Sequence, residues 1–145
     1  MRNSKEVTKP LTDFNINIKI KLACLWATLM FLYIYADYFQ LMTPGKLENL
    51  INLQTPVGPT TPLILVIFSS ILIVPALMIS LSAFLKPNFN KWLNVIVASL
   101  YTAISILIII SSIGTEWYSF YVLFNLIETA IFIVIIVQAL RWPTE

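Results

Sequence analysis

The chain contains no histidine, a single cysteine and only three glycines among its 145 residues. Without histidine it lacks the commonest metal ligand and the side chain that usually transfers protons near neutral pH. With Cys24 alone it can form no intramolecular disulfide, zinc cluster or paired-cysteine redox site. A lone cysteine within an apolar run is typical of a small core residue, and we interpret Cys24 in this way. The sequence therefore predicts no metal site and no cofactor.

Charged residues are also scarce, at 11% of the chain, whereas 59% of the residues are hydrophobic. The formal net charge is only +2, and the basic residues are spread over chain ends and connections, so we expect no nucleic-acid partner. No glycine-rich phosphate loop or other catalytic motif is present, and we therefore expect no enzyme activity. The composition instead indicates that the lipid bilayer is the solvent of this chain.

Four segments reach the roughly 20 apolar residues that a helix needs to cross the hydrocarbon layer. They cover about residues 21–39, 62–85, 92–113 and 117–140. In lipid, backbone N–H and C=O groups must be satisfied within the segment, so these runs form helices despite their many β-branched residues. We expect an all-α integral membrane four-helix bundle. It would form one transmembrane domain over residues 1–145, with residues 1–13 flexible.

Lysine and arginine are distributed unequally around these segments. Eight of the nine precede or begin the first segment, lie between the second and third, or follow the fourth, whereas Lys46 lies in the first connection. Because this bias sets the orientation of membrane proteins, we expect both termini to be cytoplasmic. The predicted location is the cell inner (plasma) membrane, crossed several times, with the first and third connections outside.

The longest connection, over residues 40–61, carries turn signals near each of its ends. Between them Leu47, Leu50 and Ile51 fall on one helical face, with charged residues elsewhere. This pattern predicts a short amphipathic helix on the outer surface, placed as a lid over the bundle. A plain surface loop is the alternative.

Glu128 is the carboxylate that lies deepest within the four segments. Counting from Trp117 at about 1.5 Å per residue places it roughly 16 Å deep, near the bilayer midplane. No basic residue lies at that depth, and intramembrane carboxylates are functional-site candidates by default. Tyr118, Tyr121 and Asn125 share its helical face, so a polar stripe runs inward from the outer end.

A comparable stripe lies on the first segment, where Trp26, Tyr33 and Asp37 follow helical spacing. If the stripes face one another, they line a polar pocket that opens outward and ends at Glu128. The candidate ligand-binding residues are accordingly Glu128, Asn125, Tyr121, Asp37, Tyr33, Trp26 and Tyr101. The alternative is that these side chains only join helices, through hydrogen bonds of about 0.6 kcal/mol each.

Pro75 lies inside the second segment, shortly after Ser69 and Ser70. Proline has no N–H, so the carbonyl of Ile71 loses its helical partner and the helix is expected to kink. A kink beside free polar groups often shapes the wall of a cavity.

A resemblance to a known family rests on four stretches of sequence. They are IKIKLACLWATLMFLYIYADYF at residues 18–39, Pro44-Gly45, Gly58-Pro59-Thr60-Thr61 and Lys91-Trp92-Leu93-Asn94. Together they resemble a family of bacterial four-helix membrane proteins that is catalogued only as a domain of unknown function. The architecture is also loosely similar to the DoxX-like membrane proteins. The resemblance implies the topology, but it assigns no functional residue.

Two functions remain open. In the first, the outward pocket binds or transports a small or lipophilic molecule, with Glu128 as a proton-sensitive contact. Because four helices make a thin wall around a solute path, transport would require a homodimer. In the second, the chain is a structural or accessory subunit that packs against a membrane protein partner.

Overall fold

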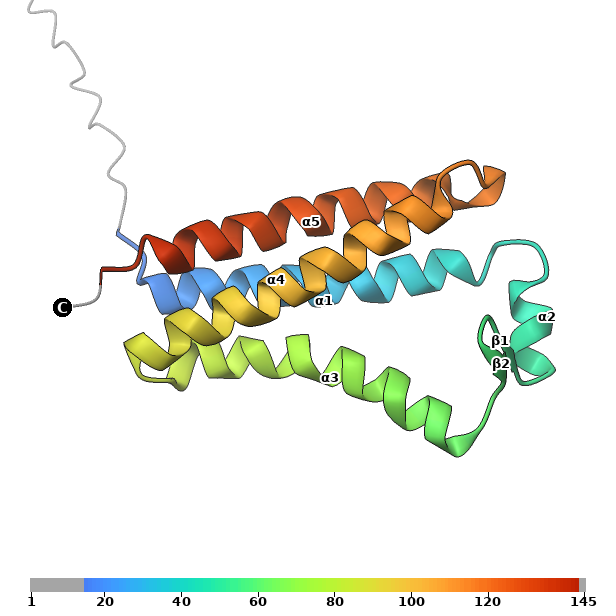
Figure 1. The fold of residues 1–145 in the computed structure, drawn as a ribbon, viewed down its shortest axis with the longest axis horizontal. Coiled ribbons are helices and arrows are strands. Elements are labelled where there is room, and N and C mark those ends of the chain that lie inside the picture. Colours follow the sequence, from blue (N-terminus) through green and yellow to red (C-terminus); the bar gives the residue numbers. More distant parts are fainter. Residues whose placement is uncertain (1–14, 144–145) are drawn as a thin grey trace, which may run out of the picture.

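A computed structural model describes residues 15–143, and the residues expected to be flexible lie outside this range. Four long helices make up most of it, namely α1 (Ile18–Gln40), α3 (Pro62–Phe84), α4 (Pro87–Ser112) and α5 (Ser119–Leu140). A 3-10 turn, η1 (Glu116–Tyr118), leads into α5. Each of the four is long and apolar enough to cross a membrane, and together they form an elongated bundle (Figure 1). The expected all-α character with four apolar helices is thereby confirmed.

Two helices begin before their apolar runs, one at a capping residue and the other at a proline. The side chain of Asn17 accepts a hydrogen bond of 2.9 Å from the backbone N–H of Lys19, so α1 begins at Ile18. Helix α4 begins at Pro87. Proline suits the first helical position because its ring fixes φ near the helical value and because it has no N–H that would be left unpaired there. Residues 87–91, which precede the apolar run, therefore belong to α4.

The bundle has two distinct ends (Figure 1). The basal end carries the start of α1, the connection from α3 to α4, and the end of α5. The loop end carries the connections from α1 to α3 and from α4 to α5. The connection from α1 to α3 contains α2 (Lys46–Ile51) and an antiparallel pair of two-residue strands, β1 (Gln54–Thr55) and β2 (Gly58–Pro59).

Helix α2 occupies the position at which the sequence predicts a short amphipathic helix. Its apolar residues Leu47, Leu50 and Ile51 are all exposed, and none of its residues is buried. Its side chains are therefore free to meet a membrane surface, and its place on the outer side stays a prediction.

The core lies in the basal and central parts of the bundle, around Trp26 and Phe132. Their rings meet edge to face with centroids 5.8 Å apart, and Phe132 is completely buried. On α1 the buried residues Leu22, Trp26 and Leu29 follow helical spacing. Cys24 falls on the opposite side of the helix and is exposed, so its interpretation as a core residue is wrong.

Helix α3 changes its relation to the bundle at Pro75. Its buried residues are Pro75, Met78 and Ser82, all towards the basal end. Towards the loop end every residue from 65 to 74 is exposed, and in Figure 1 this part of α3 turns away from α4. Helix α3 is consequently buried in the bundle only in its basal half.

Candidate functional site

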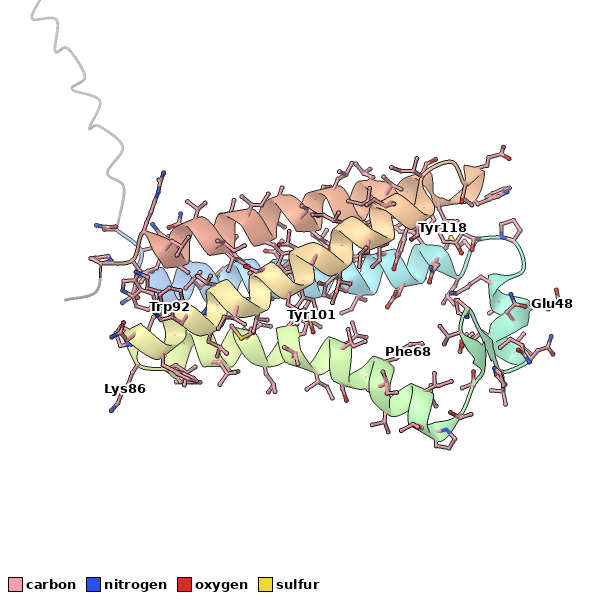
Figure 2. All side chains as sticks on the ribbon, in the orientation of Figure 1. Glu48, Phe68, Lys86, Trp92, Tyr101 and Tyr118 are labelled. Carbon is pink, nitrogen blue, oxygen red and sulfur yellow. The ribbon has the colours of Figure 1, made fainter. Side chains whose placement is uncertain are left out.

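A cavity of about 160 Å³ lies between the long helices on the loop side of the core. All four long helices contribute to its wall. The lining residues are Tyr33, Ala36, Asp37, Ile71, Leu72, Tyr101, Ile104, Ser105, Ile108, Tyr121, Asn125 and Glu128. Figure 2 shows Tyr101 on the side of α4 that faces α3, and Phe68 on the part of α3 that has turned away.

The cavity brings together most of the residues singled out from the sequence. Six of the seven candidates line it, namely Glu128, Asn125, Tyr121, Asp37, Tyr33 and Tyr101. The two polar stripes, one on α1 and one on α5, thus face a common space. Whether these side chains contact a ligand stays a prediction.

Glu128 and Asn125 are deeply buried polar residues of this cavity. Glu128 is 3% exposed and Asn125 is 2% exposed. Asp37 is exposed and lies nearer the loop end, one turn from the end of α1. The cavity therefore has a rim at Asp37 and a floor at Glu128 and Asn125.

The ionisable side chains that line the cavity are carboxyl groups and tyrosine hydroxyl groups. Glu128 lies within electrostatic reach of Asp37, Tyr33 and Tyr121. Among the described residues no lysine or arginine lines the cavity; Lys46 interacts with Asp37 from the rim. In residues 15–143 no three histidine, cysteine, aspartate or glutamate side chains gather as a metal site would require.

Asn125 has one satisfied and one unsatisfied polar atom. Its Nδ2 donates a hydrogen bond of 2.9 Å to the backbone carbonyl of Tyr121, one turn earlier in α5. Its Oδ1 is the buried side-chain oxygen that finds no hydrogen-bond partner within residues 15–143. The bond from Nδ2 fixes the orientation of the amide, because the reverse orientation would set Oδ1 against a carbonyl. An unpaired buried acceptor costs about 1–3 kcal/mol, so this atom marks a place where a donor fits.

Trp26, the seventh candidate, lies away from the cavity in a buried polar network. Its Nε1 donates a hydrogen bond of 2.7 Å to Oδ1 of Asn94, which also accepts one of 3.2 Å from the Ser82 hydroxyl. Asn94 donates in turn to Oδ1 of Asn90 at 2.7 Å, and Asn90 donates to the carbonyl of Ser82. The network joins α1, α3 and α4, which gives Trp26 a structural role.

Sequence reasoning missed Asn90 and Ser82, both completely buried members of this network. Asn90 precedes the apolar run of α4 and therefore looked like part of a connection. The spacing of Asn90 and Asn94 is a signal that could have found the pair, because residues four apart share one helical face.

The apolar helices and the polar cavity between them define a class, the multi-pass helical membrane proteins. The chain belongs to the DUF6326 family, a family of unknown function that matches residues 10–145. This agrees with the resemblance to a domain of unknown function, whereas a likeness to DoxX-like proteins and a bacterial source stay predictions. The chain matches no curated protein and no solved structure.

Proposed function

We propose that this protein binds a small lipophilic molecule, which carries a polar group, in the cavity between its helices. The observation that carries this proposal is the unpaired Oδ1 of Asn125, a residue that lines the floor of the cavity together with Glu128. An asparagine that served only to join helices would pair its acceptor with neighbouring helices, as Oδ1 of Asn94 pairs with Trp26 of α1 and Ser82 of α3. The amide of Asn125 instead keeps its acceptor free where a ligand could donate to it.

The shape and composition of the cavity fit a ligand site. Such sites are mostly apolar, with a few polar groups that fix the orientation of the ligand. Here Ile71 and Leu72 from α3 and Ile104 and Ile108 from α4 supply the apolar part. A volume of about 160 Å³ is close to that of an apolar cavity of roughly 150 Å³ that takes up benzene, so the occupant is about the size of one ring.

The cavity faces outward in this proposal. Lys86 lies at the basal end in Figure 2, and the basic residues at the ends of the four long helices, Lys19, Lys21, Lys91 and Arg141, belong to the same end. Cytoplasmic ends of membrane proteins are enriched in lysine and arginine, which supports an inner-membrane protein whose basal end and termini are cytoplasmic. The cavity lies on the loop side of the core and is then reached from outside.

A second candidate function is that of an accessory subunit. It is favoured by the loop-end half of α3, where no face of the helix is covered and Leu63, Val66 and Ile73 are each more than half exposed. A helix of a partner membrane protein, or of a second copy of the chain, could pack there. In that case α3 would carry the activity of the protein and the cavity would not.

The test is ligand-induced thermal stabilisation of the purified full-length protein in detergent, with neutral, acidic and basic one-ring compounds. We expect at least one compound to raise the unfolding midpoint of the wild type, and Glu128→Gln and Asn125→Ala to abolish that rise. Glu48→Gln is the matched control, because it makes the same change on an exposed residue of α2.

The outcome separates the two functions. A rise of equal size in the wild type and in both cavity variants would contradict binding at this cavity. The same conclusion would follow if no compound raised the midpoint while a membrane protein co-purified with the wild type and was lost on substituting exposed residues of α3.

A further inference from the structure

Both charged side chains among the described residues that line the cavity are carboxyl groups, those of Glu128 and Asp37. The lining residue Asn125 adds an unpaired acceptor, Oδ1, while the hydroxyl groups of the lining can accept as well as donate. No lysine or arginine of the described chain lines the cavity. We propose that the ligand is a ring-sized organic cation with N–H donors, that is, a lipophilic primary or secondary ammonium. This inference rests on the proposed binding function of the same cavity.

The charge of the cavity selects against other ligand classes. A ligand carboxylate would lie between Glu128 and Asp37 in a poorly solvated space, where like charges repel strongly. A neutral ligand would leave the Glu128 carboxyl without a counter-charge. Lys46 provides one for Asp37 at the rim, whereas within residues 15–143 the charged group that acts on Glu128 is Asp37, which is itself acidic. An ammonium supplies the missing partner for a buried carboxylate.

The unpaired acceptor of Asn125 indicates which kind of ammonium fits the cavity. Because Nδ2 already donates to the carbonyl of Tyr121, only Oδ1 remains, and it requires a donor. An ammonium with two or three N–H groups can donate to Asn125 and to Glu128 together. A quaternary ammonium has the charge but no N–H, and would leave Oδ1 unpaired. The rings of Tyr33 and Tyr121 can contribute cation–π attraction to either cation.

The acidic and the apolar lining residues of the cavity come from different helices. The wall formed by α1 and α5 carries Asp37, Asn125 and Glu128. Most of the wall formed by α3 and α4 consists of isoleucine and leucine side chains. A molecule with an ammonium at one end and an apolar ring at the other matches this division. The volume of about 160 Å³ accommodates a molecule such as benzylamine.

The experiment compares four probes that share one ring, namely benzylamine, benzyltrimethylammonium, benzyl alcohol and benzoate. Their binding to the purified full-length protein is measured at neutral pH, where benzylamine is protonated, by calorimetry and by the shift of the unfolding midpoint. We expect benzylamine to bind at least tenfold more tightly than each of the others. Glu128→Gln is expected to weaken benzylamine at least tenfold, and Asn125→Ala to remove most of its advantage over benzyltrimethylammonium. Glu48→Gln is expected to behave as the wild type.

The result also distinguishes this inference from the function on which it rests. Tight binding of benzyl alcohol or benzoate that depends on Glu128 and Asn125 would overturn the ammonium assignment and leave the binding function standing. Failure of all four probes to bind the wild type would overturn the ammonium assignment itself, while binding of another one-ring compound would still support the cavity. If Glu128→Gln does not fold, the ranking of the four probes on the wild type decides the question alone.

Discussion

The hydroxyl group of Tyr101 on α4 donates a hydrogen bond of 2.6 Å to the backbone carbonyl of Ile71 on α3. This is the carbonyl that Pro75 leaves free, because proline has no N–H to offer it. The neighbouring helix thus satisfies the backbone group that the proline releases. Since Tyr101 and Ile71 both line the cavity, the bend in α3 and the shape of the cavity are stabilised by one contact.

Removing the hydroxyl group tests this relationship. We expect Tyr101→Phe to lower the free energy of unfolding by about 0.6–1 kcal/mol, which is the range of one hydrogen bond between membrane helices. The phenylalanine keeps the ring contact with Phe132, whose centroid lies 6.0 Å away. Unfolding of the purified protein in mixed micelles, by denaturing detergent, measures the change.

A double-mutant cycle supplies the control. In a Pro75→Ala background the alanine N–H offers Ile71 its helical partner, so Tyr101→Phe should cost much less there. An equal loss in both backgrounds would mean that the hydroxyl stabilises the bundle in some other way.

The buried network around Asn94 should be the most sensitive polar feature of the bundle. Asn94→Ala removes the acceptor of the Trp26 indole and the Ser82 hydroxyl, and it leaves Asn90 Oδ1 without its donor. We expect a loss of about 2–3 kcal/mol of unfolding free energy, since several buried groups lose partners together. The same denaturation measurement reports it.

The matched control is Asn49→Ala, on an exposed position of α2, which should change stability by less than about 0.5 kcal/mol. If the two alanine variants unfolded at the same detergent concentration, the network would contribute nothing to the stability of the bundle.

The sequence could predict the walls of the cavity because polar side chains in an apolar helix avoid lipid. Tyr121, Asn125 and Glu128 share one face of α5 by spacing alone, and all three line the cavity. Tyr33 and Asp37 do the same on α1. In each helix the direction of the polar face follows from the period of 3.6 residues, and facing stripes follow from the cost of exposing them.

The sequence could not predict which part of the bundle each side chain reaches or which residue it contacts there. Helical periodicity predicts the face on which a residue lies, but not the group opposite that face. Trp26 shares the face of Tyr33 and Asp37, but at 1.5 Å per residue it lies about 10 Å nearer the basal end of α1 than Tyr33 does. At that level the Trp26 indole does not line the cavity and instead donates a hydrogen bond to Asn94. Asn90 was missed because apolarity marks the lipid layer, whereas Pro87 marks the start of the helix.

Glu128 is expected to differ from Asn94 in its effect on stability. No described residue donates a hydrogen bond to its carboxyl group, so Glu128→Gln removes a costly buried acid without breaking a contact. We expect the unfolding free energy without ligand to stay within about 0.5 kcal/mol of the wild type or to rise. Glu48→Gln on α2 gives the baseline, and a loss above 2 kcal/mol would show that Glu128 holds the helices together.

The orientation of the bundle can be tested with single cysteines, because Cys24 is the only native one. In a Cys24→Ala background we would place a cysteine by Glu48→Cys or Thr115→Cys at the loop end, or by Asn88→Cys at the basal end. All three positions are exposed. The excess of lysine and arginine at the basal end predicts that a membrane-impermeant thiol reagent labels both loop-end cysteines in intact cells. The basal cysteine should react only after the membrane is permeabilised.

The reverse pattern would turn the cavity towards the cytoplasm and change the side from which a ligand enters. The fold supplies an internal check, because Glu48 and Thr115 lie in different connections at the same end and must be labelled together. Labelling of only one of them would contradict the arrangement of α4 and α5 across the membrane. Agreement between them, with the basal position protected, would establish the topology independently of any ligand.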